Sequence, residues 1–314
     1  MPTFRTGNQL YFVRRFRRAI RIASNPSLYD IMRVKEKKDA KTISISFKRT
    51  TTPGVSLAIE AGFFKTCLHI DRLGYCDGSS LNSKNFQSIF RKYSPPKDIV
   101  NILVGGTDYG KYAQGQEQLV WNKIVFAGQI PDDRALKYGF NVRSKHEAIK
   151  RYLALIDKTC KYYNGNILIK LHPKLQRPKA NYESYVTEIK SIAKRHGSPC
   201  GFFDFSCIKN CQHIITGNST FTIEALTRGL NVINLLPGYF YKTGAVTFSN
   251  EDYKKAPINL REEGLKLVNF LAWKYCFPTE NFLYCLHYLN NKELFFLPEK
   301  FSFAAKLILE NNND

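Results

Sequence analysis

The sequence has no apolar run long enough to cross a lipid bilayer. A membrane-spanning helix needs roughly 18 to 20 consecutive apolar residues, and no uninterrupted apolar segment approaches that length. The first residues are basic, but they lack the apolar stretch and the small-residue cleavage site of a secretory signal. We therefore expect the protein to stay in the cytoplasm.

The cysteines lack the spacing of a structural zinc site. The chain has 8 cysteines, without close CxxC pairs and without the density of a secreted disulfide scaffold. Cys207, Cys211 and His213 form the one group that resembles a metal site, but Ile214 and Ile215 follow directly, as in a buried strand. We expect no metal ion, and we interpret most of the cysteines as buried apolar residues.

Acidic residues are scarce relative to basic ones. The chain has 26 Asp and Glu against 47 Lys and Arg, which is a formal net charge of +21. Such a surface attracts anions, so nucleic acid, anionic lipid and phosphorylated substrates are candidate partners. The basic residues are scattered through the chain and match no nucleic-acid-binding module, so we expect no nucleic-acid partner.

Residues 10–23 predict a basic amphipathic helix. Helical spacing gathers Phe12, Phe16 and Ile20 on one side, and arginines spread over the rest. The helix has two interpretations: it packs on the surface of its own domain, or it attaches the protein to an anionic membrane surface.

The length of 314 residues is natural for two α/β domains that share a cleft. The elements predicted for residues 1–117 are strands at 42–47 and 66–70, a helical stretch at 55–61 and a Gly-rich connection at 105–118. Residues 118–314 alternate more regularly, as is typical of a Rossmann-like parallel sheet. The predicted strands are 123–127, 166–171, 208–216 and 231–235, and the predicted helices are 145–162, 181–196, 221–228, 261–275 and 280–290.

Three polar motifs follow predicted strands of the second part, at the place where open α/β sheets bind ligands. In the first, IKLHP, a buried strand brings Lys170 and His172 to its end. The pair suits a phosphate, although a single histidine at a strand end is more often structural. In the second, TGNSTF, Ser219 and Thr220 stand at a helix N-terminus. They either cap the helix or accompany backbone N–H groups that bind an anion.

Carboxylates accompany these motifs. Glu224 lies about one turn into the helix after Ser219, where it either binds the two hydroxyls of a ribose or pairs with the helix dipole. The third motif, GQIPDD, places Asp132 and Asp133 after the first strand of this part. These side chains either cap a helix or supply a nucleophile for an oxocarbenium-like anomeric carbon.

In order and spacing, the motifs resemble the β-Kdo transferases of bacterial capsule synthesis. The series is IEAGFF and HIDRLGY in the first part, then GQIPDD, KLHP, GNSTFTIEALTRGLNVI and PGYFY in the second. The resemblance runs from about residue 42 to 250. The Gln-x-x-x-Asp spacing and the EAGFF segment make it specific, because HP and Ser motifs are shared by several CMP-dependent families.

The resemblance implies an enzyme that needs no metal ion and has the GT-B fold. In this fold, two Rossmann-like domains face a central cleft, and helices follow at the C-terminus. It also implies a reaction that retains the donor configuration through a covalent sugar-carboxylate adduct. Gln129 and Asp133 match the family's Gln-x-x-x-Asp, so Asp133 is the expected nucleophile. The first part departs from the family at Ala61, which stands where the family has the second residue of an acidic pair. Glu60 is therefore left alone for a role on the acceptor side.

For the donor, the resemblance assigns Lys170 and His172 to the CMP phosphate, Ser219 with its neighbour Thr220 to phosphate binding, and Glu224 to the ribose. It implies no cofactor apart from CMP-Kdo, the donor substrate. The expected partners are this CMP-sugar, a glycolipid or glycan acceptor and an anionic membrane surface.

We therefore expect a CMP-Kdo-dependent β-Kdo transferase of capsule or surface polysaccharide synthesis. Its expected location is cytoplasmic and peripheral, on the inner face of the cytoplasmic membrane. One alternative is another CMP-dependent GT-B enzyme, of the sialyltransferase or glycerophosphotransferase type, against which Gln129 and Asp133 argue. The less favoured alternative is a basic nucleic-acid-binding protein.

Overall fold

The computed structural model describes residues 45–47, 57–64, 67–71, 73, 76–105, 120–255, 258–281, 285 and 298–311. The predicted basic helix at 10–23, nearly all of the predicted connection at 105–118 and most of the predicted helix at 280–290 lie outside the described residues.

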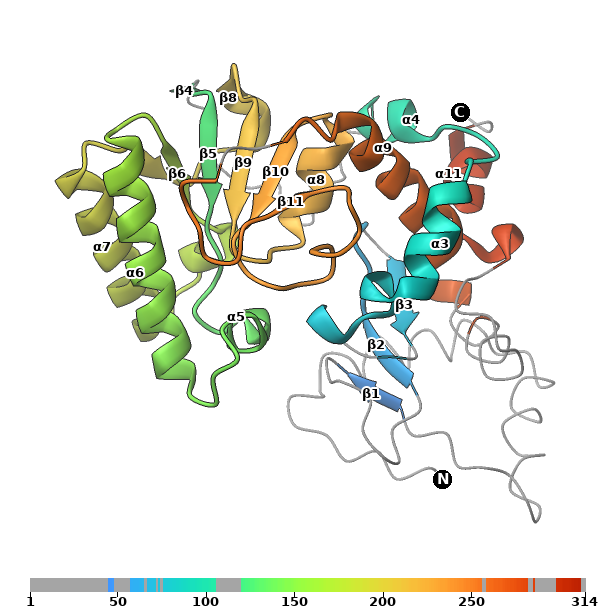
Figure 1. Cartoon of the computed structure of the whole chain (residues 1–314), viewed down its shortest axis with the longest axis horizontal. Helices are drawn as coiled ribbons and strands as arrows, with labels where there is room; N and C mark the ends of the chain where they lie inside the picture. The colour runs from blue at the N-terminus through green and yellow to red at the C-terminus, as the bar shows by residue number, and fades with distance from the viewer. Residues whose placement is uncertain are drawn as a thin grey trace, which may run out of the picture.

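The larger sheet is parallel throughout and has the strand order β11-β10-β9-β5-β6-β7 (Figure 1). Its strands are β5 (Ile124–Ala127), β6 (Leu168–Lys170), β7 (Cys200–Gly201), β9 (His213–Thr216), β10 (Asn231–Asn234) and β11 (Thr247–Phe248). A short pair, β4 (Val120–Trp121) and β8 (Ile208–Lys209), lies beside it. The strands near the centre are apolar at nearly every position because helices cover both faces.

Successive residues of these strands face opposite helix layers. Phe126, Ile169, Ile215 and Ile233 pack with α6 (Lys145–Tyr163) and α7 (Ala180–Arg195). Their neighbours Val125, Leu168, Ile214 and Val232 pack with α8 (Phe221–Thr227) and α9 (Arg261–Phe270). The predicted alternation is therefore confirmed for these strands and for α6, α7 and α8, and the predicted 208–216 strand divides into β8 and β9.

The smaller sheet differs from the prediction. It contains β1 (Ile45–Phe47), β2 (Leu57–Ala61), β3 (Cys67–Asp71) and β12 (Cys276–Pro278) in that order, and only the β1–β2 pairing is parallel. The helical stretch predicted at 55–61 is wrong, because β2 is a central strand paired on both sides. A short apolar run does not distinguish a buried strand from a helix. Gly62 then closes the β2–β3 hairpin, since its N–H donates to the Cys67 carbonyl at 2.8 Å.

The last strand of the smaller sheet comes from the other end of the chain. The helix predicted at 261–275 is α-helical only to Phe270, continues as a π-helical turn from Leu271 to Tyr275, and leads into β12. The remaining main helices around this sheet are α3 (Lys84–Lys92), α4 (Val100–Gly105) and α11 (Phe303–Asn311).

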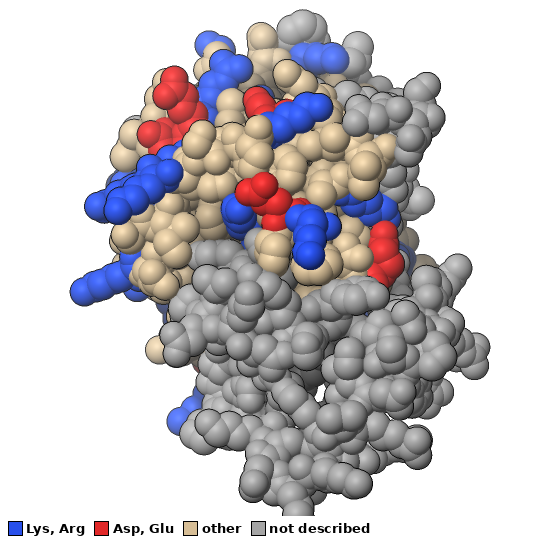
Figure 2. Space-filling model, turned by 90° about the vertical axis from the view of Figure 1, so that its right-hand side faces the viewer, with Lys and Arg blue, Asp and Glu red and all other residues tan. Residues whose placement is uncertain are grey.

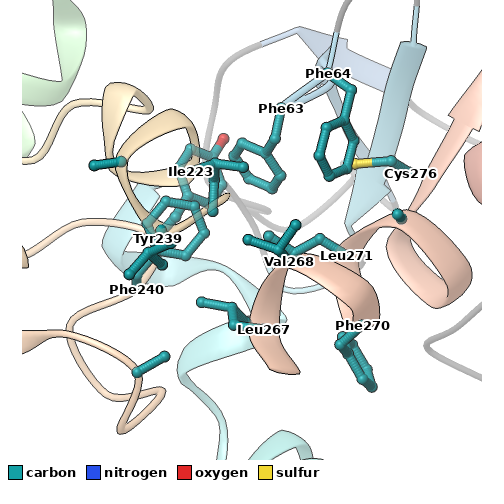
Figure 3. Close-up of a cluster of buried hydrophobic side chains, with 14 of the residues drawn as sticks. Phe63, Phe64, Ile223, Tyr239, Phe240, Leu267, Val268, Phe270, Leu271 and Cys276 are labelled. Carbon is teal, nitrogen blue, oxygen red and sulfur yellow. The ribbon is translucent and has the colours of Figure 1, made fainter. Parts of the chain in front are cut away.

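One hydrophobic core joins the two sheets. Figure 3 shows Phe63, from the turn after β2, beside Tyr239 and Phe240 from the loop after β10, with Val268 and Leu271 of the α9 segment close by. The ring of Phe63 lies 5.2 Å from that of Tyr239 and 5.1 Å from that of Phe240. The smaller sheet is thereby held against the carboxyl side of the larger one.

Lys and Arg side chains are spread over the described part of the face in Figure 2, with Asp and Glu among them. They do not form one continuous patch on that face. No helix among the residues described above is long and apolar enough to cross a membrane.

Candidate functional site

Three polar loops meet at the carboxyl edge of the larger sheet. The strand β5 lies between β6 and β9, with Ala127 opposite Lys170 on one side and opposite Thr216 on the other. The segments that follow these residues therefore leave the sheet side by side. Glu60 is elsewhere, in β2, where its backbone pairs with that of His69; its side chain lies outside the description.

Gln129 and Asp133 are in direct contact. The Gln129 amide donates from Nε2 to Asp133 Oδ2 at 3.1 Å, and Gln129 is only 1% exposed. Asp133 is the N-cap of α5 (Arg134–Gly139), and its Oδ1 accepts the N–H of Ala135 at 2.9 Å. Both carboxylate oxygens are thus oriented by N–H donors, and the capping interpretation of Asp133 is confirmed. Its role as a nucleophile stays a prediction.

The neighbouring Asp132 faces different partners. It forms ion pairs with Lys145 and Lys179, and it accepts a hydrogen bond from the Tyr182 hydroxyl at 3.3 Å. Burial raises the pKa of Asp132, but the hydrogen bond and charge of Lys145, with Lys179 and Tyr182, outweigh this and hold the pKa below its usual value. Asp132 therefore ties this loop to α6 and α7, and the two adjacent carboxylates diverge.

Asn218 connects the loops, and the motif analysis assigned it no role. Its backbone N–H donates to Gln129 Oε1 at 3.0 Å, and its Oδ1 accepts from Gln129 Nε2 at 3.0 Å. Its side-chain amide also donates to the carbonyls of Ala135 at 2.7 Å and Pro237 at 2.8 Å. The signal in the sequence was its place in the GNST motif, between a strand and a helix.

Lys170 is a buried cation at the end of β6, 8% exposed, with its Nζ 5.5 Å from the centre of the Phe221 ring. Burial lowers the pKa of Lys170, and the charges of Glu224 and Asp204 act in the opposite direction. Burial likewise raises the pKa of Glu224, opposed by Lys170 and Arg228. The structure thus brings Lys170 and Glu224 into one charged cluster.

Asp204 and Arg228 belong to the same cluster, and neither was given a role from the sequence. Burial raises the pKa of Asp204, but its hydrogen bonds from Ser206 and the charges of Lys170 and Arg228 bring the pKa below the usual value. Asp204 follows β7, far in sequence from the other members, so only the sheet order places it there.

His172 is a neutral hydrogen-bonding group. Burial, together with the charges of Lys174, Lys170 and Arg177, lowers the pKa of His172 to about 3. Its Nδ1 accepts the N–H of Lys174 at 3.1 Å, so in the neutral ring the proton is on Nε2. In the neutral ring, His172 is thus an acceptor at Nδ1 and a donor at Nε2.

Ser219 and Thr220 differ in what they do at the start of α8. The Ser219 hydroxyl oxygen accepts the N–H of Phe221 at 3.2 Å. Thr220, directly before the helix, has a helical backbone and makes no side-chain capping bond. Ser219 is therefore the hydroxyl residue that caps α8.

The first-part motifs are largely structural. Phe63, from EAGFF, stacks on His69 with ring centres 4.9 Å apart. Asp71 is 2% exposed and accepts hydrogen bonds at Oδ2 from Tyr275 at 2.6 Å, from Ser79, and from the N–H and hydroxyl of Ser80. These contacts tie β3 to the turn before β12.

A separate open pocket of about 620 Å³ lies between α3, the loop at Lys242–Gly244 and the start of α9. Its lining includes Arg91 and Lys266, and none of the residues predicted for the site lines it. Among the described residues, no group of three His, Cys, Asp or Glu side chains has the geometry of a metal site.

A parallel sheet with helices on both faces and polar loops at its carboxyl edge defines the Rossmann-like α/β class, whose members bind ligands at that edge. Residues 106–257 match the family model described as capsule polysaccharide biosynthesis protein. This match supports the capsule-synthesis family expected from the motifs.

The solved structures that resemble the chain include two of KpsC. Thermosulfurimonas dismutans KpsC, beta Kdo 2,7 transferase, has a TM-score of 0.51 and 16% identity, covering 90% of this chain and 97% of its own. The beta Kdo 2,4 transferase of KpsC from the same organism has a TM-score of 0.44 and 15% identity, covering 71% and 73%. The first likeness shows a shared fold. No curated protein matches the chain significantly.

Proposed function

We propose that the protein is a retaining glycosyltransferase that moves β-Kdo from CMP-Kdo to a lipid-linked or glycan acceptor in capsule or surface polysaccharide synthesis. The observation that carries the proposal is the contact between Gln129 and Asp133 at the carboxyl edge of the larger sheet. The capsule polysaccharide family match and the fold shared with a β-Kdo transferase support it.

The proposed GT-B arrangement uses the smaller sheet as the acceptor side and the larger sheet as the donor side. The domains are residues 1–117 and 118–314. In this arrangement, β12 and the π-helical turn before it belong to residues 118–314, but they return to the smaller sheet, where β12 pairs with β3.

At the donor side, Lys170 neutralises the CMP phosphate, and the neutral His172 donates to it from Nε2. The Ser219 hydroxyl and the adjacent Thr220 contact the same phosphate. Glu224 accepts hydrogen bonds from the ribose hydroxyls. The burial of Lys170 supports this assignment, because a charge-assisted hydrogen bond to a phosphate is stronger where water is excluded.

The proposed reaction has two displacements. Asp133 Oδ2 attacks the anomeric carbon of the sugar, and CMP leaves with the electrons of the broken bond. The acceptor hydroxyl then attacks the same carbon, its proton passes to Glu60, and the Asp133 carboxylate is released. Two inversions retain the donor configuration.

The functional test is CMP release from a panel of CMP-sugars, with and without glycan acceptors. We expect release that depends on Kdo as the sugar. Release only from a CMP-sialic acid or CDP-glycerol would instead assign the alternative classes of CMP-dependent enzyme. Salt-dependent retention on DNA without release from any CMP-sugar would favour the nucleic-acid-binding alternative.

We also propose that the basic segment at 10–23 holds the enzyme on the inner face of the cytoplasmic membrane, where a glycolipid acceptor is available. Each basic residue near an anionic leaflet adds about 1 kcal/mol to binding. Changing Arg14, Arg17 and Arg18 to Glu should therefore release the protein from anionic liposomes in a sedimentation assay. Undiminished liposome binding by this variant would contradict the proposal.

A further inference from the structure

We propose that Asn218 is a positioning residue, which fixes the orientation of the Gln129 amide and, through it, of the Asp133 carboxylate. The inference rests on the proposed role of Asp133 as nucleophile. Asn218 is 4% exposed and acts through other side chains; it has no assigned contact with the donor.

The contacts between Gln129 and Asn218 permit one orientation of the Gln129 amide. Gln129 Nε2 has two N–H groups, and they reach Asp133 Oδ2 at 3.1 Å and Asn218 Oδ1 at 3.0 Å. Gln129 Oε1 accepts the backbone N–H of Asn218 at 3.0 Å. Rotating the amide by half a turn would place Oε1 against two acceptor oxygens and Nε2 against an N–H donor. Asn218 therefore selects the orientation in which Gln129 donates to Asp133.

Asn218 is itself oriented by the element that Asp133 caps. Its Nδ2 donates to the carbonyl of Ala135, and the N–H of Ala135 donates to Asp133 Oδ1. A second donation to the Pro237 carbonyl fixes the other N–H of the Asn218 amide. Asp133 is thus connected to Asn218 through Gln129 at one oxygen and through Ala135 at the other.

Three glycines provide the space for this network. A methyl group on Gly217 would lie 2.4 Å from Gln129 Oε1. Methyl groups on Gly139 and Gly238 would lie 2.7 Å from the Nδ2 and the Cβ of Asn218. The backbone at these three glycines therefore lies close to the Gln129 and Asn218 side chains, and a larger residue there would press against the network.

This packing matters for chemistry because a nucleophile must approach its target carbon along a defined direction. A displacement of about 1 Å can reduce a reaction rate roughly 100-fold. With Asn218 removed, the Gln129 amide gains a second orientation, and the donor hydrogen bond to Asp133 Oδ2 is lost in part of the population.

The test is a double-mutant cycle with Asn218→Ala, Gln129→Ala and the double variant, assayed by turnover of CMP-Kdo. We expect Asn218→Ala to lower turnover about 10- to 100-fold in the wild-type background, with the KM for CMP-Kdo nearly unchanged. In the Gln129→Ala background the same change should have almost no further effect. Equal fold losses in the two backgrounds would overturn the proposal.

A second pair of variants separates positioning from stability. Asn269, in α9, is equally buried and uses its side chain to bond Ile99 and Asp98 far from Gln129. We expect Asn269→Ala to lower the melting temperature as much as Asn218→Ala while leaving turnover unchanged. Gly217→Ala, which pushes against Gln129 Oε1, should reproduce the loss of turnover; full activity of this variant would count against the proposal.

A wild-type protein that releases no CMP from CMP-Kdo would contradict the proposed function. The positioning itself is then tested by the crystal structure of Asn218→Ala. A rotated Gln129 amide that no longer donates to Asp133 supports the inference. An unchanged contact between Gln129 Nε2 and Asp133 Oδ2 overturns it.

Discussion

The two sheets use their polar residues differently. At the carboxyl edge of the larger sheet, Lys170 ends strand β6, and His172 and Asp133 lie in the segments that follow β6 and β5. The packing of these strands is made by other, apolar residues. In the smaller sheet, the motif residues Phe63 and Asp71 are themselves part of the packing. The motifs of the family resemblance therefore include residues of the proposed binding site at the larger sheet. In the smaller sheet, they include residues that hold the fold together.

The strongest test of this difference is the change Asp133→Asn. Asparagine is also a good N-cap, so α5 should remain intact while the nucleophile is lost. We expect turnover to fall by roughly 10³-fold or more, with CMP affinity retained in calorimetry. Asp132→Asn is the matched control and should keep most of the turnover.

The same experiment has a direct chemical readout. Wild-type protein trapped with donor and no acceptor should gain the mass of one sugar, and the modified peptide should contain Asp133. An adduct on another peptide, or a fully active Asp133→Asn enzyme, would remove Asp133 from the mechanism.

The donor contacts should give the next largest effect. Replacing Lys170 with Met keeps the apolar stem and removes the charge, which should weaken CMP binding by roughly 1.5 to 3 kcal/mol, or about 10- to 150-fold in Kd. Ser219→Ala should weaken it less. Arg177→Ala removes an exposed positive charge nearby and should have little effect; equal losses for Lys170 and Arg177 would indicate only a general electrostatic attraction.

In the smaller sheet, Asp71→Asn should affect stability. Hydrogen bonds to a charged group contribute about 1.5 to 3 kcal/mol, so we expect a loss of that size in the free energy of unfolding, measured with urea. The control is Asp98→Asn, which should cost less, because the Asp98 carboxylate also accepts N–H bonds, from Val100 and Asn269, but is exposed. Abolished transfer by an Asp71→Asn protein of unchanged stability would show that the smaller sheet carries chemistry too.

The smallest expected effect concerns His172 and pH. The pKa of His172 is lowered from 6.5 to about 3 in the folded protein. Between these two pH values, the unfolded chain therefore binds a proton at His172 more readily than the folded protein does. The free energy of unfolding consequently falls as the pH falls through this range. His172→Asn keeps a side-chain acceptor for the Lys174 N–H but removes the titrating group. Its melting temperature should therefore fall less steeply between pH 7 and 4 than that of the wild type.

The exposed His146, on α6, serves as the control for that measurement, and His146→Asn should keep the wild-type slope. Identical slopes for the wild type and the His172→Asn variant would show that His172 is not held neutral by the fold.

The sequence alone determined the helices and strands that a local hydrophobic pattern predicts. The helices at 145–163 and 180–195 were predicted almost to their ends because each has a long amphipathic repeat. The strands at 124–127 and 168–170 were predicted because continuous apolar runs are typical of a parallel sheet covered on both faces. The ends of these two strands predict Gln129, Lys170 and His172 at one edge of the sheet.

Tertiary structure decided what depends on partners distant in the chain. The segment 57–61 is a strand because β1 and β3 hydrogen-bond to it. Five residues are too few to show a periodicity that would distinguish a strand from a helix. The strand β12 reaches β3 across about two hundred residues of chain. Asn218 and Asp204 acquire their roles from Gln129 and Lys170, which they meet only because the strand order brings separate loops to the same edge.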